Sequence, residues 1–418
     1  MLDLSARDRA LLDGAHGDAA ALAMRILVDM AGVAGADRLV DITSAHIDGC
    51  LYHGIAGLEF AERLAAGDAR VGVPTSLNVG YVDLLHPERY RGDPADAERG
   101  RRQMDLYLEM GCRPTWTCAP YQLAERPSLG EHVAWAESNA IVFCNSVLGA
   151  RTDRYGDFID IAAAITGRAP LAGLHRDEER RASLVLRLEG LSSRLLDADA
   201  LYPVLGHVLG REAGTAVAAI VGLSPTTSED RLKALCAAAA SSGAVAMVHA
   251  VGRTPEAPTL AAATGDAAVP EISVTPARLR AARDELDTST GGALGAVSVG
   301  TPHASLAELT RLASLVAQHP PKVPVFVNTA RDVLAEAERA GVVRALASAG
   351  VEIVTDTCTY LMPLMPEIDG PVMTDSAKWA WYAPANVGVD VVIGSLEDCA
   401  RSAAAGRVVR DETVWMPQ

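Results

Sequence analysis

Ala296-Val-Ser-Val-Gly-Thr-Pro-His303 is the stretch that decides the fold. Its small and β-branched residues predict a short buried strand over 296–300, and the polar residues Thr301 and His303 follow directly. Other apolar runs that lead into polar residues predict strands at 38–43, 71–74, 244–249, 323–328 and 351–355. Because open α/β sheets bind ligands at the carboxyl ends of their strands, the pattern predicts an α/β fold with a polar site at those ends.

Length and composition support this class. The chain has 418 residues, which is more than one hydrophobic core usually spans, so we expect two or three domains or subdomains. Hydrophobic residues make up 49% of it and aromatic residues only 4%, so Ala, Val, Leu and Ile must build the core. The net charge of -16 argues against nucleic acid and against anionic membrane surfaces as partners. A small anionic substrate is still compatible with it, because a local Arg or Lys cluster is enough to bind one.

The sequence also bears on the compartment. No apolar run reaches the roughly 18 residues that a membrane span needs. The first ten residues carry several charges, so we expect no signal peptide. Seven cysteines, an odd number, then predict a reducing cytoplasm. The thiols would serve a metal, catalysis, or simply the core.

Two helices are predicted near the N-terminus. Ser5 followed by Asp8 is typical of a helix N-cap with an acid at its third position, and a second helix is predicted from His16. The chain shows neither a convincing repeat nor a low-complexity linker. The expected internal breaks lie near 190–199 or 257–274, and we predict an inner subdomain over about 195–350.

The stretch Ala140–Arg154 combines several polar groups after an apolar run. The run over 141–143 predicts a buried strand that stops at Asn145 and Ser146, before a turn that contains Gly149. Arg151 and Arg154 follow, and Arg forks bind carboxylate or phosphate oxygens. The alternative is a turn whose arginines are solvated.

The cysteines differ in what their surroundings indicate. Cys118 lies six positions after Cys112, which is no zinc-ribbon spacing, but a lone Cys before Pro is compatible with an iron–sulfur cluster whose other ligands are distant. Cys358 follows a predicted strand. Cys399 is predicted near the start of a helix ending at Gly406, where a structural role is favoured. Further thiols are Cys50, a candidate ligand, and the weaker candidates Cys112, Cys144 and Cys236.

Two further residues are candidates for chemistry. His303, just past a strand, could be an acid or base near neutral pH, or only hydrogen-bond its loop. Lys378 could bind a substrate carboxylate, although a lysine of this kind is more often solvated.

Together these segments resemble the large catalytic part of the aconitase X family. The resemblance extends over nearly the whole chain. The matching stretches, in order, are His46–Gly54, Val73–Asn78, Thr117–Tyr121, Trp135–Ala140, Asn145–Arg151, Thr166–Pro170, Gly300–His303, Asp356–Cys358, Asp375–Lys378 and Gly394–Cys399.

The resemblance implies a hydro-lyase with an iron–sulfur cluster that removes water from a small hydroxy acid. It implies an α/β, aconitase-like large body of several subdomains over residues 1–418. Bacterial members are cis-3-hydroxy-L-proline dehydratases, and the predicted reaction is the conversion of that substrate to a pyrroline-2-carboxylate. The alternatives are a mevalonate 5-phosphate dehydratase, the archaeal activity, and a cluster-less metabolite-binding or scaffold subunit.

The resemblance also implies roles for single residues. The cluster iron would act as a Lewis acid on the departing hydroxide, a base would take a proton, and polar groups would bind the carboxylate. The predicted catalytic residues are His46, Asp48, His303 and Lys378, of which Lys378 also suits carboxylate binding. The predicted substrate-binding residues are Asn78, Asn145, Ser146, Arg151 and Ser376. The predicted cluster ligands are Cys118, Cys358 and Cys399, with Cys50 as a competitor for the third position.

The sequence departs from the family pattern in two respects. Archaeal members tend to have Cys at the position of Thr301. Its absence here favours a [2Fe-2S] over a [4Fe-4S] cluster, or a site with a different third ligand, and it favours the bacterial activity. The family's small swivelling domain has no room here, because the matches extend from His46 to Cys399. A separate small subunit is therefore expected as a partner.

Overall fold

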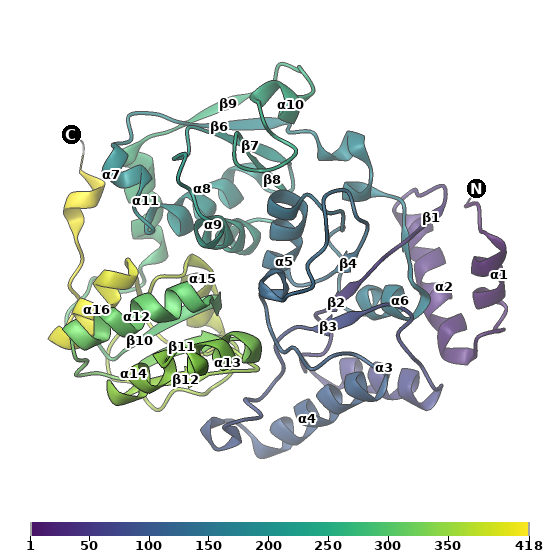
Figure 1. Cartoon of the computed structure of the whole chain (residues 1–418), viewed down its shortest axis with the longest axis horizontal. Helices are drawn as coiled ribbons and strands as arrows, with labels where there is room; N and C mark the ends of the chain where they lie inside the picture. The colour runs from purple at the N-terminus through teal and green to yellow at the C-terminus, as the bar shows by residue number, and fades with distance from the viewer. Residues whose placement is uncertain (1, 417–418) are drawn as a thin grey trace. The chain divides into compact units, whose positions relative to one another are not determined.

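The computed structural model describes residues 2–416, which form two compact units (Figure 1). Unit 1 contains the residues up to Val82 together with Asp93–Arg181. Unit 2 contains Asp83–Gly92 and the residues from Ala182 onward. The short segment 83–92 is thus part of unit 2, although its neighbours on both sides in the sequence belong to unit 1. The inner subdomain predicted over about 195–350 stays a prediction.

Unit 1 is built around a small parallel sheet with strand order β3-β2-β4. A separate antiparallel pair joins β1 and β5. The strands of unit 1 are β1 (Leu39–Asp41), β2 (Ala45–Ile47), β3 (Thr75–Leu77), β4 (Ala134–Trp135) and β5 (Arg168–Pro170). Its helices are α1 (Ala6–Leu12), α2 (Asp18–Val33), α3 (Ile55–Ala66), α4 (Pro94–Glu109), α5 (Ser138–Phe143) and α6 (Ile159–Thr166).

The first helix begins as its sequence predicts. Ser5 Oγ accepts a hydrogen bond from the Asp8 N–H at 3.1 Å, and the Asp8 carboxylate accepts one from the Ser5 N–H at 2.9 Å. The same buried carboxylate accepts a bond from Arg168 Nε at 2.8 Å. This ion pair fastens α1 to β5.

Unit 2 contains two parallel sheets, with strand orders β8-β7-β6-β9 and β12-β11-β10-β13-β14. The strands of the first are β6 (Leu184–Leu188), β7 (Ala218–Val221), β8 (Val248–Ala250) and β9 (Glu271–Val274). The strands of the second are β10 (Ala296–Ala304), β11 (Val325–Thr329), β12 (Val351–Val354), β13 (Val372–Thr374) and β14 (Val391–Ile393). The helices are α7 (Ser193–Leu196), α8 (Leu201–Ala213), α9 (Glu229–Ser242), α10 (Leu260–Thr264), α11 (Pro276–Leu286), α12 (Leu306–Gln318), α13 (Arg331–Arg339), α14 (Val342–Ser348), α15 (Ala377–Asn386) and α16 (Leu396–Ala405).

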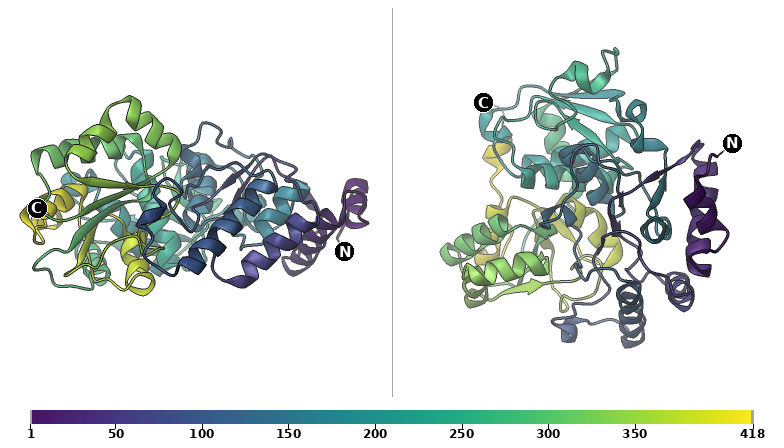
Figure 2. Two further views of the ribbon diagram at one scale, coloured as in Figure 1. Left: turned by 90° about the horizontal axis from the view of Figure 1, so that it is seen from below. Right: turned by 45° about the vertical axis from the view of Figure 1, so that its right-hand side comes forward.

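Alternation along the strands divides the five-stranded sheet into two buried faces. Val297 and Val299 point into an aliphatic core shared with α12, α13, α14 and α16, and Figure 2 shows these helices beside the strands. Ser298 points the other way, and its hydroxyl lies 2.7 Å from the hydroxyl of Thr359. Trp379 of α15 donates its ring N–H to the Thr359 hydroxyl. Helices on both faces of a parallel sheet confirm the predicted α/β class.

Several expected elements are confirmed and three are not. Four of the predicted strands correspond to β1, β10, β11 and β12. The strand predicted at 71–74 begins only at Thr75, since Pro74 has no N–H for the ladder. The strand predicted at 244–249 forms only from Val248.

Among the described residues, no helix combines the length and apolar character that a membrane crossing requires.

The strand expected over 141–143 is a helix, and this prediction was wrong. These residues belong to α5, and a π-helical turn continues from Cys144 to Leu148 before Gly149 ends it at a φ of 68°. The Glu137 carboxylate caps α5 by accepting a bond from the Ala140 N–H at 2.9 Å. A short run buried on all sides has no periodicity that separates a strand from a helix.

Candidate metal centre and catalytic site

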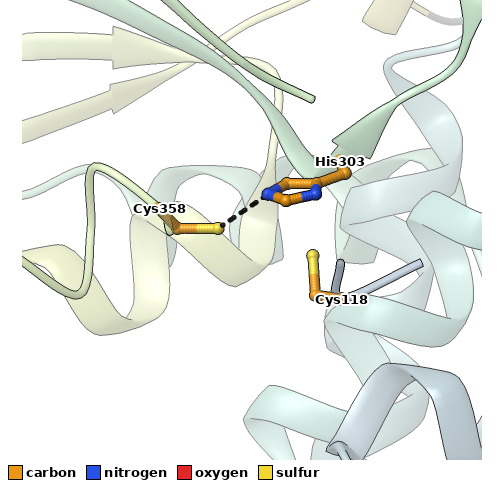
Figure 3. A group of neighbouring side chains, drawn as sticks. All are labelled: Cys118, His303 and Cys358. Carbon is orange, nitrogen blue, oxygen red and sulfur yellow. Dashed lines mark hydrogen bonds between the residues drawn. The ribbon is translucent and has the colours of Figure 1, made fainter. Parts of the chain in front are cut away.

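A buried histidine and a buried cysteine meet at the carboxyl edge of the five-stranded sheet. His303 lies at the end of β10, and Cys358 lies in the loop after β12. His303 Nε2 is 3.5 Å from Cys358 Sγ, and neither residue is exposed to solvent. Figure 3 draws these two side chains together with Cys118, a residue of unit 1. The pair arises because β10 and β12 both run parallel to β11, so their carboxyl ends reach the same edge.

The backbone of β10 is irregular just before His303. The pairing with β11 shifts register between Val299 and Ala304. Gly300 lies in this shift at a φ of 78°, and a Cβ there would be 2.4 Å from the Asn328 carbonyl oxygen. Glycine is therefore required for the bend that brings His303 to the edge.

Asn328 connects β10, which carries His303 near its end, to the loop that bears Cys358. Its Nδ2 donates to the Val299 carbonyl at 3.0 Å, and its Oδ1 accepts from the Thr359 N–H at 3.1 Å. The side chain is fully buried in β11. Sequence reasoning missed this residue, although a polar side chain at the end of an apolar strand was a signal that could have found it.

Cys118 belongs to unit 1 and is 2% exposed. It precedes a short 3-10 turn over Pro120–Gln122. Its carbonyl accepts a bond from Asn139 Nδ2 at 2.9 Å, and the next residue donates its N–H to Thr117 Oγ1 at 3.0 Å. Hydrogen bonds therefore fix both the carbonyl and the N–H of the peptide group that follows this thiol.

The other two predicted cysteine ligands lie in different surroundings. Cys399 is buried in α16 within the aliphatic core under the sheet. Within residues 2–416, its thiol does not belong to the group of possible metal ligands that contains His303 and Cys358. Burial and the nearby Asp375 raise the pKa of Cys399 well above its usual range. Cys50 Sγ donates to the carbonyl of Asn78 at 3.4 Å, and burial likewise raises the pKa of this thiol. Both environments favour a protonated, structural thiol, so the structure gives these two ligand assignments no support.

His46 and Asp48 differ in protonation. His46 lies in β2 with no exposed surface, and its Nδ1 is 2.8 Å from Ser76 Oγ. Burial lowers the pKa of His46 to about 3, so its ring is neutral. Loss of solvent raises the pKa of Asp48 well above its usual range, and the carboxyls of Glu137 and Asp157 add to the rise. Asn78, another predicted site residue, donates its Nδ2 to the Asp48 carboxyl.

A second buried acid, which sequence reasoning missed, supports the loop of Asp48. The Asp160 carboxylate accepts bonds from the N–H groups of Asp48 at 2.8 Å and Gly49 at 3.2 Å. Burial, with the charge of Asp157, raises the pKa of Asp160 to about 7. In unit 1, burial thus raises the pKa of three carboxyls, those of Asp48, Asp157 and Asp160, above the usual range.

The residues of the expected anion clamp make contacts within unit 1. Asn145 donates its Nδ2 to the Thr152 carbonyl at 2.9 Å and accepts at Oδ1 from Arg180 Nη1 at 3.1 Å. Arg151 donates to the His175 carbonyl at 3.0 Å and forms an ion pair with Asp177. Ser146 is buried in the π-helical turn. The role of these residues in substrate binding stays a prediction.

Lys378 and Ser376 lie at the start of α15. Ser376 is its N-cap and accepts a bond at Oγ from the Trp379 N–H at 3.1 Å. Lys378 is only 2% exposed, so the solvated alternative is wrong for this residue. Its ammonium lies 5.8 Å from the centre of the Tyr360 ring, an interaction that stabilises a cation away from water. A buried cation of this kind suits a carboxylate ligand.

Models of three domains account for most of the chain. The first, second and third domains of aconitase X match residues 1–178, 182–284 and 294–405. The chain belongs to the aconitase X family. The first family domain ends near Arg181, where unit 1 ends, and unit 2 contains the other two family domains.

Known members of the aconitase X family agree with this membership. A cis-3-hydroxy-L-proline dehydratase from Pseudomonas aeruginosa is 45% identical over 99% of this chain and 72% of its own length. A phosphomevalonate dehydratase large subunit from Methanothermobacter thermautotrophicus is 38% identical over 93% of this chain and 96% of its own length. The crystal structure of Thermococcus kodakaraensis aconitase X in its holo-form superposes with a TM-score of 0.87, at 33% identity, over 96% of this chain and all of that chain. The expected aconitase-like body is thereby confirmed.

Proposed function

We propose that this chain is a hydro-lyase that dehydrates cis-3-hydroxy-L-proline to a pyrroline-2-carboxylate. The observation that carries the proposal is the 45% identity, over 99% of the chain, to a relative of that name, against 38% for the phosphomevalonate dehydratase large subunit. The presence of Thr301, where archaeal members tend to have Cys, supports the same choice.

We further propose that an iron–sulfur cluster is bound by Cys118, Cys358 and His303. The fit rests on the buried contact between His303 Nε2 and Cys358 Sγ, because nitrogen and sulfur donors suit cluster iron. His303 thus replaces Cys399 as the third ligand and loses its predicted role in proton transfer. A ligand set with so few thiolates favours a [2Fe-2S] over a [4Fe-4S] cluster. When bound, the cluster would supply a Lewis acid for the departing hydroxide.

The proposed roles of the remaining residues follow from their charge. Asp48, whose pKa burial raises well above its usual range, holds a proton more tightly than an ordinary carboxyl and is the candidate base for the carbon beside the carboxylate. Lys378, a buried cation, is the candidate partner of the substrate carboxylate. The neutral ring of His46 suits orientation rather than proton transfer, because its pKa lies near 3.

A separate small subunit is proposed as a partner. The chain corresponds to 96% of a relative that is itself called a large subunit, but to 72% of the cis-3-hydroxy-L-proline dehydratase. The same coverage favours one alternative function, that of a phosphomevalonate dehydratase large subunit. A cluster-less binding subunit is the remaining alternative.

The test is anaerobic reconstitution of the chain, alone and with a co-encoded small protein. Iron, sulfide and the visible spectrum would be measured, followed by assays with cis-3-hydroxy-L-proline and with mevalonate 5-phosphate. Cys118→Ala and Cys358→Ala should lose colour and turnover, whereas Cys236→Ala, a change in the core of α9, should retain both. Wild-type protein without iron after reconstitution would refute the cluster, and turnover of the phosphorylated substrate alone would select the alternative function.

A further inference from the structure

The segment Asp83–Gly92 is a separate feature of unit 2, which we call the strap. In the sequence it lies between β3 and α4, both of which belong to unit 1. In the structure it belongs to unit 2 and contains only a short 3-10 turn over Pro87–Arg89. Its contacts, rather than regular structure, must therefore hold it in place.

The first residue of the strap binds the loop that carries Cys358. Asp83 is 1% exposed. Its Oδ2 accepts a bond from the Thr355 N–H at 3.3 Å, and its Oδ1 accepts one from the Thr355 hydroxyl at 3.2 Å. In return, the Asp356 carboxylate accepts a bond from the Leu84 N–H at 3.0 Å. The strap and the loop thus exchange hydrogen bonds in both directions.

Asp356, two residues before Cys358, has a backbone that needs such support. Its φ is 61°, in the left-handed region that residues with a Cβ seldom occupy. Arg331 binds its carboxylate through Nε and Nη2, each at 2.6 Å, and Leu84 of the strap binds the same group. A strained residue persists where its surroundings fix it, and here the strap is part of those surroundings.

The strap also contacts the chain on both sides of this loop. The Arg89 guanidinium lies 3.5 Å from the Asp83 carboxylate and donates to the carbonyl of Ile353. The Arg91 N–H donates to the carbonyl of Pro363 at 2.9 Å. The strap therefore binds the chain at two points, one before and one after Cys358 in the sequence.

We infer that the strap positions Cys358 for the metal and that Asp83 is a positioning residue of this centre; the inference rests on the proposed role of Cys358 as a ligand. Asp83 acts through Thr355 and Asp356 and does not itself bind the metal. Groups that orient a ligand in this way typically contribute ten- to hundredfold in metal affinity.

The first test compares Asp83→Asn with Glu88→Gln, a control that removes one carboxylate charge from the same strap. Glu88 has a side chain that is 71% exposed and lies 3.6 Å from His86, another residue of the strap. The chain without its cluster is titrated with Co²⁺, and the thiolate-to-cobalt absorption band is followed. Asp83→Asn should weaken binding by roughly ten- to hundredfold, while Glu88→Gln should match the wild type. Equal affinities in all three proteins would overturn the inference.

A second test needs no metal. Amide hydrogen exchange over residues 355–359 should be at least about tenfold faster in Asp83→Asn than in the wild type and unchanged in Glu88→Gln. If Asp83→Asn does not fold, Thr355→Val removes one of the two bonds and should show a smaller change in the same direction. Wild-type protein that takes up no cobalt would count against the proposed function, whereas unchanged exchange in the variants would count against the strap alone.

Discussion

Replacement of Asn328 by Ala should weaken both unit 2 and the binding of the proposed metal by His303 and Cys358. The side chain is fully buried and bridges the Val299 carbonyl, at 3.0 Å, and the Thr359 N–H, at 3.1 Å. The loss of a partner for two buried backbone groups costs about 2–4 kcal/mol in the free energy of unfolding. In a unit of this size, about 2–4 °C of melting temperature corresponds to each kcal/mol, so the expected fall is roughly 5–15 °C.

The assay is thermal melting of the chain with and without iron, together with the rate at which a chelator removes iron. Asn386→Ala is the matched control, because Asn386 is exposed at the end of α15 and its loss should change stability by less than about 0.5 kcal/mol. Iron loss from Asn328→Ala should be faster than from the wild type, since the amide joins β10, which carries His303, to the loop of Cys358. A melting temperature within about 2 °C of the wild type, with normal iron retention, would refute the reasoning.

Three further changes test other parts of the structure. Gly300→Ala should destabilise unit 2 by more than about 2 kcal/mol, measured by melting, because its Cβ would be 2.4 Å from a backbone oxygen of Asn328; a neutral result would contradict the requirement for glycine at the bend in β10. Because the pKa of Asp160 in the folded state is raised to about 7, the folded state binds more protons than the unfolded state between about pH 4 and 7. The free energy of unfolding should therefore fall as pH rises through this range. Asp160→Asn should flatten this fall, and an identical slope in both proteins would exclude Asp160 as its source. Arg151→Ala should raise KM by at least about tenfold if the guanidinium binds the substrate carboxylate, whereas Asp177→Ala should leave KM unchanged; equal, small effects of both would identify a surface ion pair alone.

Much of the fold and part of the site could be predicted from local patterns. Val297 and Val299 alternate with Ser298, so β10 and the polar residues after it were evident. The capping pair Ser5 and Asp8 marked the start of α1. The pattern failed at 141–143, where a run buried on all sides has no periodicity to separate a helix from a strand.

The sequence by itself determined the class of fold, the family resemblance and the identity of His303 and Cys358 as residues at strand ends, because these depend on neighbours along the chain. Only the tertiary structure decided that these two side chains meet, that Arg151 pairs with Asp177, and that Asp83 binds the loop of Cys358. Each of these contacts joins residues 26 to 272 positions apart. A local pattern contains no information on such pairs, because strand order and the path of the strap decide which distant residues become neighbours.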